Sequence, residues 1–114
     1  MEKIQKDKLR GHLDGLVLSV LEQGDGHGYE ILQRLRTLSE DALQLKEGSL
    51  YPALYRLEKD AQIKAKWESG TSKRPGPRRR IYSITTKGKR TLTKQREEWQ
   101  TFRSVIGRIM EQPT

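Results

Sequence analysis

A run of turn-forming residues limits the folds open to this chain more than any other feature. Residues 69–77, SGTSKRPGP, contain two prolines and two glycines and cannot form a helix or a central strand. The segment before it, 63–67, alternates apolar and charged residues as a half-buried strand does, with Trp67 expected to face inward, and 80–84 has the composition of a second strand. The sequence therefore predicts one β-hairpin with a basic tip.

Two helices are expected at the N-terminal end of the chain. Apolar side chains recur there three or four residues apart, which predicts helices over 9–22 and 27–39. Two glycines around Asp25 break the pattern between them, and Asp25 can cap the second helix by accepting from its free amides. We expect His27 in the first turn of that helix and Tyr29 as a packing residue.

A third helix is expected to begin near Gly48 or Ser49. Pro52 has no amide hydrogen, so it fits the first turn of a helix rather than its interior. The buried stripe is predicted to be Leu50, Leu54, Leu57 and Ala61. The opposite face carries Pro52, Tyr55, Arg56 and Lys59, with Ser49 and Tyr51 at its flanks. Two tyrosines beside an arginine on a solvated face favour a binding role.

After the hairpin, the pattern predicts a long helix from about 86 to 110, with Thr85 as its N-cap. At ~1.5 Å per residue it would be about 35–40 Å long. Its main apolar residues fall into two interleaved sets spaced seven apart: Leu92, Trp99, Phe102, Ile106 and Ile109. A chain this short cannot build a core that covers such a length. These residues are therefore predicted to pack against a second copy of the chain.

The basic charge is concentrated in one part of the chain. Between Lys64 and Arg96 there are twelve lysines or arginines and one acid, so this segment carries +11 and the remainder −3, for a formal net charge of +8. This asymmetry favours a polyanionic partner. No stretch approaches the ~20 apolar residues needed to span a bilayer, and the N-terminus lacks the apolar segment of a signal peptide. We expect a cytoplasmic protein with no membrane partner.

Several kinds of chemistry have no support in the sequence. The chain has no cysteine, and its two histidines, His12 and His27, have no cluster of other ligands at metal-binding spacing. Acidic pairs such as 40–41 and 97–98 are neighbours in sequence, and neighbours on a helix do not share a face. We therefore expect no enzymatic activity, no cofactor and no metal.

Three segments together resemble the PadR-type transcriptional regulators. They are HGYEI at 27–31, EGSLYPALYRLEKD at 47–60 and RRRIYSITTKG at 78–88, and the resemblance extends over roughly 9–110. It implies a mainly α fold with a small β-hairpin, a winged helix-turn-helix followed by a long C-terminal dimerisation helix. The implied organisation is an N-terminal arm at 1–8, the DNA-binding domain at 9–85, the dimerisation helix at 86–111 and a tail at 112–114.

The resemblance also implies a function. Such proteins are bacterial homodimers that bind pseudo-palindromic operators and repress nearby genes, and many are released by a small-molecule effector. In some compact members a planar aromatic ligand enters the dimer interface between paired tryptophans of the last helix, a position that Trp99 matches. The family usually has glycine just after the third helix, where this chain has Ala61. Because a left-handed cap is costly for alanine, we expect this helix to end differently or to run on slightly.

In a winged helix-turn-helix the third helix enters the major groove and the hairpin lies alongside it. The predicted DNA contacts are Ser49, Tyr51, Pro52, Tyr55, Arg56 and Lys59 on the helix, and Lys64, Lys66, Lys73, Arg74, Arg78, Arg79 and Arg80 on the hairpin. Charge alone also permits a basic RNA- or ribosome-associated protein. Sequence-specific RNA binding, however, usually relies on aromatic-rich sheets or single-strand grooves.

Overall fold

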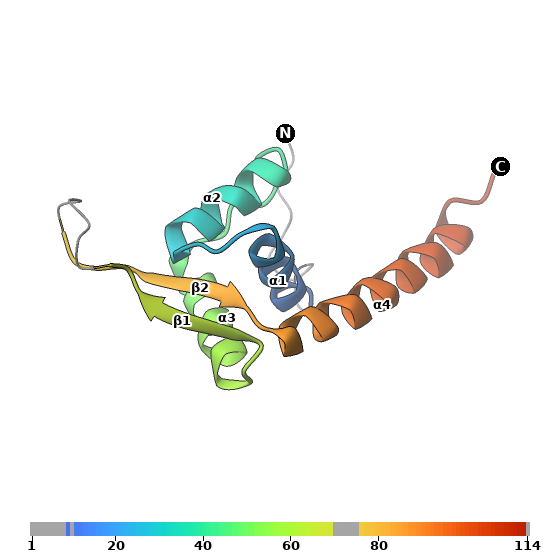
Figure 1. Cartoon of the computed structure of the whole chain (residues 1–114). Helices are drawn as coiled ribbons and strands as arrows, with labels where there is room; N and C mark the ends of the chain where they lie inside the picture. Colours follow the sequence, from blue (N-terminus) through green and yellow to red (C-terminus); the bar gives the residue numbers. More distant parts are fainter. Residues whose placement is uncertain (1–8, 10, 70–75, 114) are drawn as a thin grey trace.

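In the computed structural model, which describes residues 9, 11–69 and 76–113, the chain forms four helices and one hairpin. In order, they are α1 (Leu13–Gln23), α2 (Gly28–Leu38), α3 (Glu47–Lys59), β1 (Ile63–Trp67), β2 (Arg80–Ile84) and α4 (Thr86–Met110). The first three helices, the hairpin and the start of α4 pack together, and the rest of α4 extends away from them (Figure 1). This arrangement confirms the predicted fold class. The expected arm at 1–8 lies outside the described residues.

The hydrophobic core is centred on α1. Its residues Val17, Leu18, Val20 and Leu21 are at most 1% exposed, because α2, α3, β2 and α4 all pack against this helix. The other elements contribute Ile31, Leu35, Leu50, Leu54, Leu57, Ile63, Tyr82 and Leu92 to the same cluster. Since α3 gives only one of its faces to this core, the opposite face remains open to solvent.

The first helix is shorter at its start than the apolar pattern predicted. α1 begins at Leu13 instead of residue 9, because Gly11 adopts a φ of 86°, which is incompatible with a right-handed helix. Leu9 still packs against the core as a partly buried side chain. The pattern therefore located a core residue correctly but assigned it to the wrong element.

α2 is capped by His27, so the prediction of Asp25 as its N-cap is wrong. The His27 ring accepts from the Glu30 amide at 3.3 Å, and the Glu30 carboxylate accepts from the His27 amide at 3.2 Å, which forms a capping box. The chain is still extended at Gly26, because this residue pairs with Tyr82 in an isolated antiparallel bridge. Because of this bridge, the helix begins only after Gly26, and its start is held against β2.

α3 begins at Glu47, so Pro52 lies inside the helix and not in its first turn as predicted. A proline here leaves the carbonyl of Gly48 without its helical amide partner. Gly48 is exposed, so water can take the place of that amide. The proline is tolerated because it faces solvent on the side of the helix away from the core.

The chain leaves α3 through a left-handed residue. Ala61 has a φ of 60° and is exposed, so both the expectation of a different helix end and its predicted place in the buried stripe are wrong. Two hydrogen bonds hold the turn: the Gln62 amide donates to the Leu57 carbonyl at 2.9 Å, and the Thr85 hydroxyl donates to the Ala61 carbonyl at 2.7 Å. The surrounding structure therefore imposes a conformation that alanine disfavours.

Replacing Ala61 with glycine should stabilise the protein. Glycine removes the cost of about 1–2 kcal/mol for an alanine in the left-handed conformation. It also makes the unfolded chain more flexible, which lowers the free energy of unfolding by about 0.4–1 kcal/mol. We expect the free energy of unfolding in urea, at fixed protein concentration, to rise by roughly 0.5–1 kcal/mol. Ala42→Gly, at a loop position without a positive φ, should lower it. A loss of stability in Ala61→Gly would contradict this account.

β1 and β2 pair antiparallel over the predicted residues, from Ile63 opposite Ile84 to Trp67 opposite Arg80. Trp67 is nevertheless 56% exposed, so its predicted inward packing is wrong. The hairpin extends beyond the helices (Figure 1). The Trp67 ring therefore packs with the Arg80 guanidinium, which lies 5.6 Å from the ring centroid.

α4 spans the predicted residues, and the Thr85 hydroxyl caps it by accepting from the Gly88 amide at 3.1 Å. A Cβ at Gly88 would overlap the Gln62 carbonyl, so glycine permits this close docking. Leu92 is 2% exposed within the core, and its predicted place in the dimer interface is wrong. Beyond it the C-terminal half of α4 projects away from the other described elements (Figure 1).

Candidate nucleic-acid interface

The solvent-facing side of α3 carries several of the predicted contacts. Tyr55 is 67% exposed, and Pro52 and Lys59 are exposed beside it. Tyr51, which is 44% exposed, lies at the border towards the hairpin, and Ser49 is half-buried. The major groove admits one helix and presents donors, acceptors and thymine methyl groups. Tyrosine, lysine and proline side chains on this face suit such a surface.

Arg56 is placed at the other border of this face. Its guanidinium donates to the carboxylate of Asp14 on α1 at 2.9 Å, and both side chains remain substantially exposed. An exposed ion pair of this kind contributes about 0–1 kcal/mol. The pair therefore orients Arg56 without preventing it from exchanging Asp14 for a phosphate or a guanine edge.

Arg80 is engaged within the protomer rather than directed at solvent alone. It donates to the Glu58 carboxylate of α3 at 2.8 Å and lies over the ring of Trp67. These contacts tie β2 to the exposed side of α3. Arg80 thus positions the hairpin relative to the helix, a role that the sequence did not indicate.

The remaining basic side chains of the hairpin do not form one group. Lys64 and Lys66 are exposed on the face of β1 opposite to Ile63 and Ala65, so they point away from the helices. Arg78 is exposed and donates to the Glu68 carbonyl at 3.2 Å, whereas the half-buried Arg79 lies beside His27. The predicted contacts Lys73 and Arg74 lie outside the described residues.

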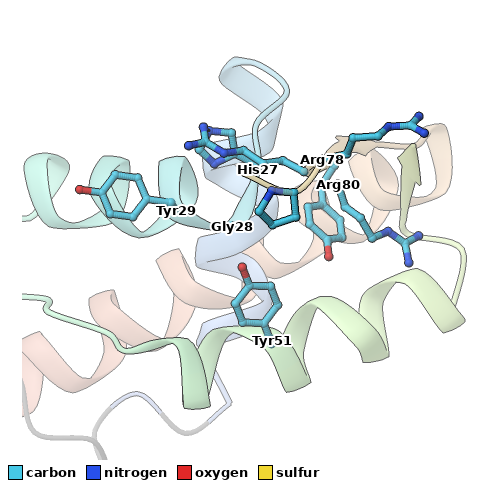
Figure 2. A pocket seen from close by; sticks show the side chains of 9 residues that line it. His27, Gly28, Tyr29, Tyr51, Arg78 and Arg80 are labelled. Carbon is cyan, nitrogen blue, oxygen red and sulfur yellow. The ribbon is translucent and has the colours of Figure 1, made fainter. Parts of the chain in front are cut away.

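A pocket of about 300 Å³ opens where the starts of α2 and α3 meet β2 (Figure 2). It is lined by His27, Gly28, Tyr29, Tyr51, Pro77, Arg78, Arg79, Arg80 and Tyr82. In Figure 2, Tyr51 rises from α3 and directs its hydroxyl towards Gly28. A Cβ at Gly28 would overlap that hydroxyl, so glycine lets the two helices approach this closely.

Sequence reasoning missed part of this pocket. Tyr29 was expected to pack inward, but it is 60% exposed and its ring stacks on His27 with centroids 6.5 Å apart. Tyr82 was not singled out, although the alternation of β2 places it on the same face as Ile84. The pairing of Gly26 with Tyr82 brings the start of α2 to β2, where the pocket lies, but no local sequence pattern predicts this pairing.

A second exposed surface lies on the C-terminal half of α4. Its apolar side chains are between 37% and 78% exposed: Trp99, Phe102, Val105, Ile106, Ile109 and Met110. Trp99 stacks on Phe102 with centroids 6.1 Å apart and meets the His12 ring edge-on at 5.6 Å. We call this surface the α4 apolar face.

Two kinds of site have no candidate in the described part of the chain. Within it, no group of three or more His, Cys, Asp or Glu residues is placed to hold a metal ion. Among the described helices, none has the length and apolar content required to cross a membrane.

A helix-turn-helix whose third helix lies beside a basic hairpin defines a winged helix protein of the DNA-binding class. Residues 17–94 match the model of the PadR-like family of transcriptional regulators. The match covers more than half of the chain, and the chain belongs to this family. It is therefore a DNA-binding transcriptional regulator and not an enzyme.

Two solved structures of transcriptional regulators agree with this assignment. The chain is 36% identical to a transcriptional regulator from Clostridium thermocellum, with a TM-score of 0.83 and coverage of 94% of this chain and 98% of that one. A PadR family regulator from Clostridium difficile is also 36% identical, with a TM-score of 0.76 over 88% and 99%. An uncharacterised Lysinibacillus sphaericus protein is 34% identical over 95% of this chain and 96% of its own length.

Proposed function

We propose that this protein is a sequence-specific repressor that binds a pseudo-palindromic operator as a homodimer in the bacterial cytoplasm. The observation that carries the proposal is the open face of α3, with Tyr55 and Lys59 exposed and the hairpin fixed beside it through Arg80 and Glu58. A helix and hairpin held in fixed relation can engage one half-site together. Repression then follows from occupation of the promoter by the bound dimer.

The α4 apolar face supports the homodimer. Large apolar side chains gathered on one exposed surface mark an interaction site. Trp99, Phe102, Ile106 and Ile109 continue the predicted heptad-like spacing after Leu92 has joined the core. Pairing of two copies through this face would place two α3 helices on one duplex, which matches the symmetry of a palindromic operator.

The test is a competition between duplex DNA and single-stranded RNA. The purified chain is used to select duplexes from a random pool, and the selected duplex is then competed with unlabelled RNA at physiological salt. We expect enrichment of a palindromic sequence and retention of the duplex in an excess of RNA. Preferential binding of RNA would instead favour the RNA- or ribosome-associated alternative.

Trp99 is also the proposed site of a planar aromatic effector, held between the two copies of this residue in the dimer. Such a ligand should quench tryptophan fluorescence by stacking on the indole. We expect the quench to be lost in Trp99→Ala and to survive in Trp67→Ala, whose tryptophan lies on the hairpin. Equal loss in both variants would argue against the interface site.

A further inference from the structure

We propose that the pocket between α2, α3 and β2 is a phosphate-binding site that holds one backbone phosphate of the operator on each protomer. This inference deepens the proposed function and rests on it. The pocket of about 300 Å³ has room for a phosphate with parts of its flanking sugars. Its lining combines three arginines with three tyrosines, a composition suited to an anion rather than to an apolar ligand.

Tyr82 provides the most specific observation. Its side chain is 6% exposed and lines the pocket, yet within the described chain its hydroxyl has no hydrogen-bond partner. The hydroxyl itself is not among the sealed, unpartnered polar atoms of the described chain, so it reaches the open space of the pocket and is available to a ligand there. Burial raises the pKa of Tyr82 above its ordinary value, so the phenol keeps its proton and remains a donor. A phosphate oxygen in the pocket would supply the missing acceptor.

The start of α2 adds further donors. Gly28 and Tyr29 both line the pocket and occupy the first two helical positions, where amides have no acceptor within the helix. No other described residue accepts from them either. The Tyr51 hydroxyl lies directly against Gly28 from the side of α3. Two backbone amides and two phenols therefore surround the same space, at the end of the helix where the dipole favours negative charge.

Arg79 supplies charge at the rim of the pocket. Its Nη1 is 2.7 Å from Nε2 of His27, and within the described chain this is the single close polar contact of the Arg79 side chain. The other ring nitrogen of His27 accepts from the Glu30 amide, so in the neutral ring Nε2 carries the proton, lies 3.1 Å from the Glu30 carboxylate and cannot accept from the guanidinium. Arg79 thus keeps donors that a phosphate can use in a charge-assisted bond.

The proposal is tested by neutralising backbone phosphates one at a time. Duplexes selected by the full-length protein are synthesised with single methylphosphonate linkages and titrated with wild type and Tyr82→Phe. Loss of one charged-group hydrogen bond corresponds to about a 10-fold loss of affinity. We expect the methylphosphonate at one linkage per half-site to lower the affinity of wild type by at least about 10-fold. The same linkage should lower the affinity of Tyr82→Phe several-fold less, because this variant has already lost one donor to that phosphate.

Tyr55→Phe is the matched control, because it removes the same hydroxyl from α3 outside the pocket. The loss of affinity caused by Tyr55→Phe and the loss caused by the methylphosphonate at that linkage should add. Tyr82→Phe should unfold at about the same urea concentration as wild type, since within the described chain it breaks no hydrogen bond. If it does not fold, Tyr51→Phe should show the same coupling at the same linkage.

Additive losses at every linkage in both pocket variants would overturn the phosphate site and leave operator binding intact. In another outcome, the losses are additive and millimolar inorganic phosphate, at constant ionic strength, displaces the duplex. This outcome would assign the pocket to a free anion and would also overturn the proposed site for an operator phosphate. Failure to bind any duplex would instead overturn the proposed function, and the phosphate site with it.

Discussion

Ile106→Glu should convert the protein from a dimer to a monomer and abolish tight operator binding. Ile106 is 38% exposed in the middle of the α4 apolar face and takes no part in the protomer's core. In a dimer built on this face, each copy would bring a carboxylate into an apolar contact without a partner, which carries a desolvation penalty of several kcal/mol. A lone protomer binds one half-site, so the affinity for a palindromic operator should fall by about 10²- to 10⁴-fold.

Sedimentation equilibrium and operator titration would measure the two effects of Ile106→Glu. Gln100→Glu is the matched control, because it adds the same charge to an exposed position of the same helix. It should leave both the dimer and the affinity unchanged. Retention of a dimer by Ile106→Glu would contradict the proposed role of the α4 apolar face.

Operator affinity should also fall steeply with salt. The exposed cations near the hairpin and α3 include Lys59, Lys64, Lys66 and Arg78, and each phosphate that such groups neutralise releases counterions. With roughly 6–10 phosphate contacts in a dimer, affinity should drop by about 10³- to 10⁵-fold between about 50 and 200 mM salt. Titration of the selected duplex at several salt concentrations gives this slope directly.

Single substitutions measure the contribution of each cation to the salt dependence. If Lys66 contacts a phosphate, Lys66→Ala should flatten the slope of log affinity against log salt by about 1 per contact. Arg103→Ala, on the distant half of α4, should leave the slope unchanged. A nearly flat salt response of the wild-type protein would remove the electrostatic part of the account.

The sequence predicted the elements well because each has a strong local signal. The hairpin strands and α4 have the expected bounds, since alternation, the turn-forming run and the Thr85 cap are all local features. Trp67 was misplaced because alternation tells which face a residue occupies but not where the neighbouring helices stop. Leu92 was misplaced because heptad-like spacing continues unchanged when the packing partner changes from the core to an exposed face.

The site was less predictable because it depends on contacts between distant residues. Arg56 and Arg80 were expected to face DNA, but their partners Asp14 and Glu58 lie 42 and 22 residues away in sequence. No periodic pattern indicates such pairings. Tyr82 has the spacing of an ordinary core residue, and its place in the lining of the pocket becomes apparent only when its neighbours from α2 and α3 are known.

A hydroxyl-radical footprint of the wild-type protein on its selected duplex tests most directly whether two copies of α3 read one operator. The account predicts two protected segments related by a two-fold axis, with centres about one helical turn, ~10–10.5 base pairs, or a multiple of it apart. A single protected segment at saturating protein, or uniform protection that does not depend on sequence, would contradict it.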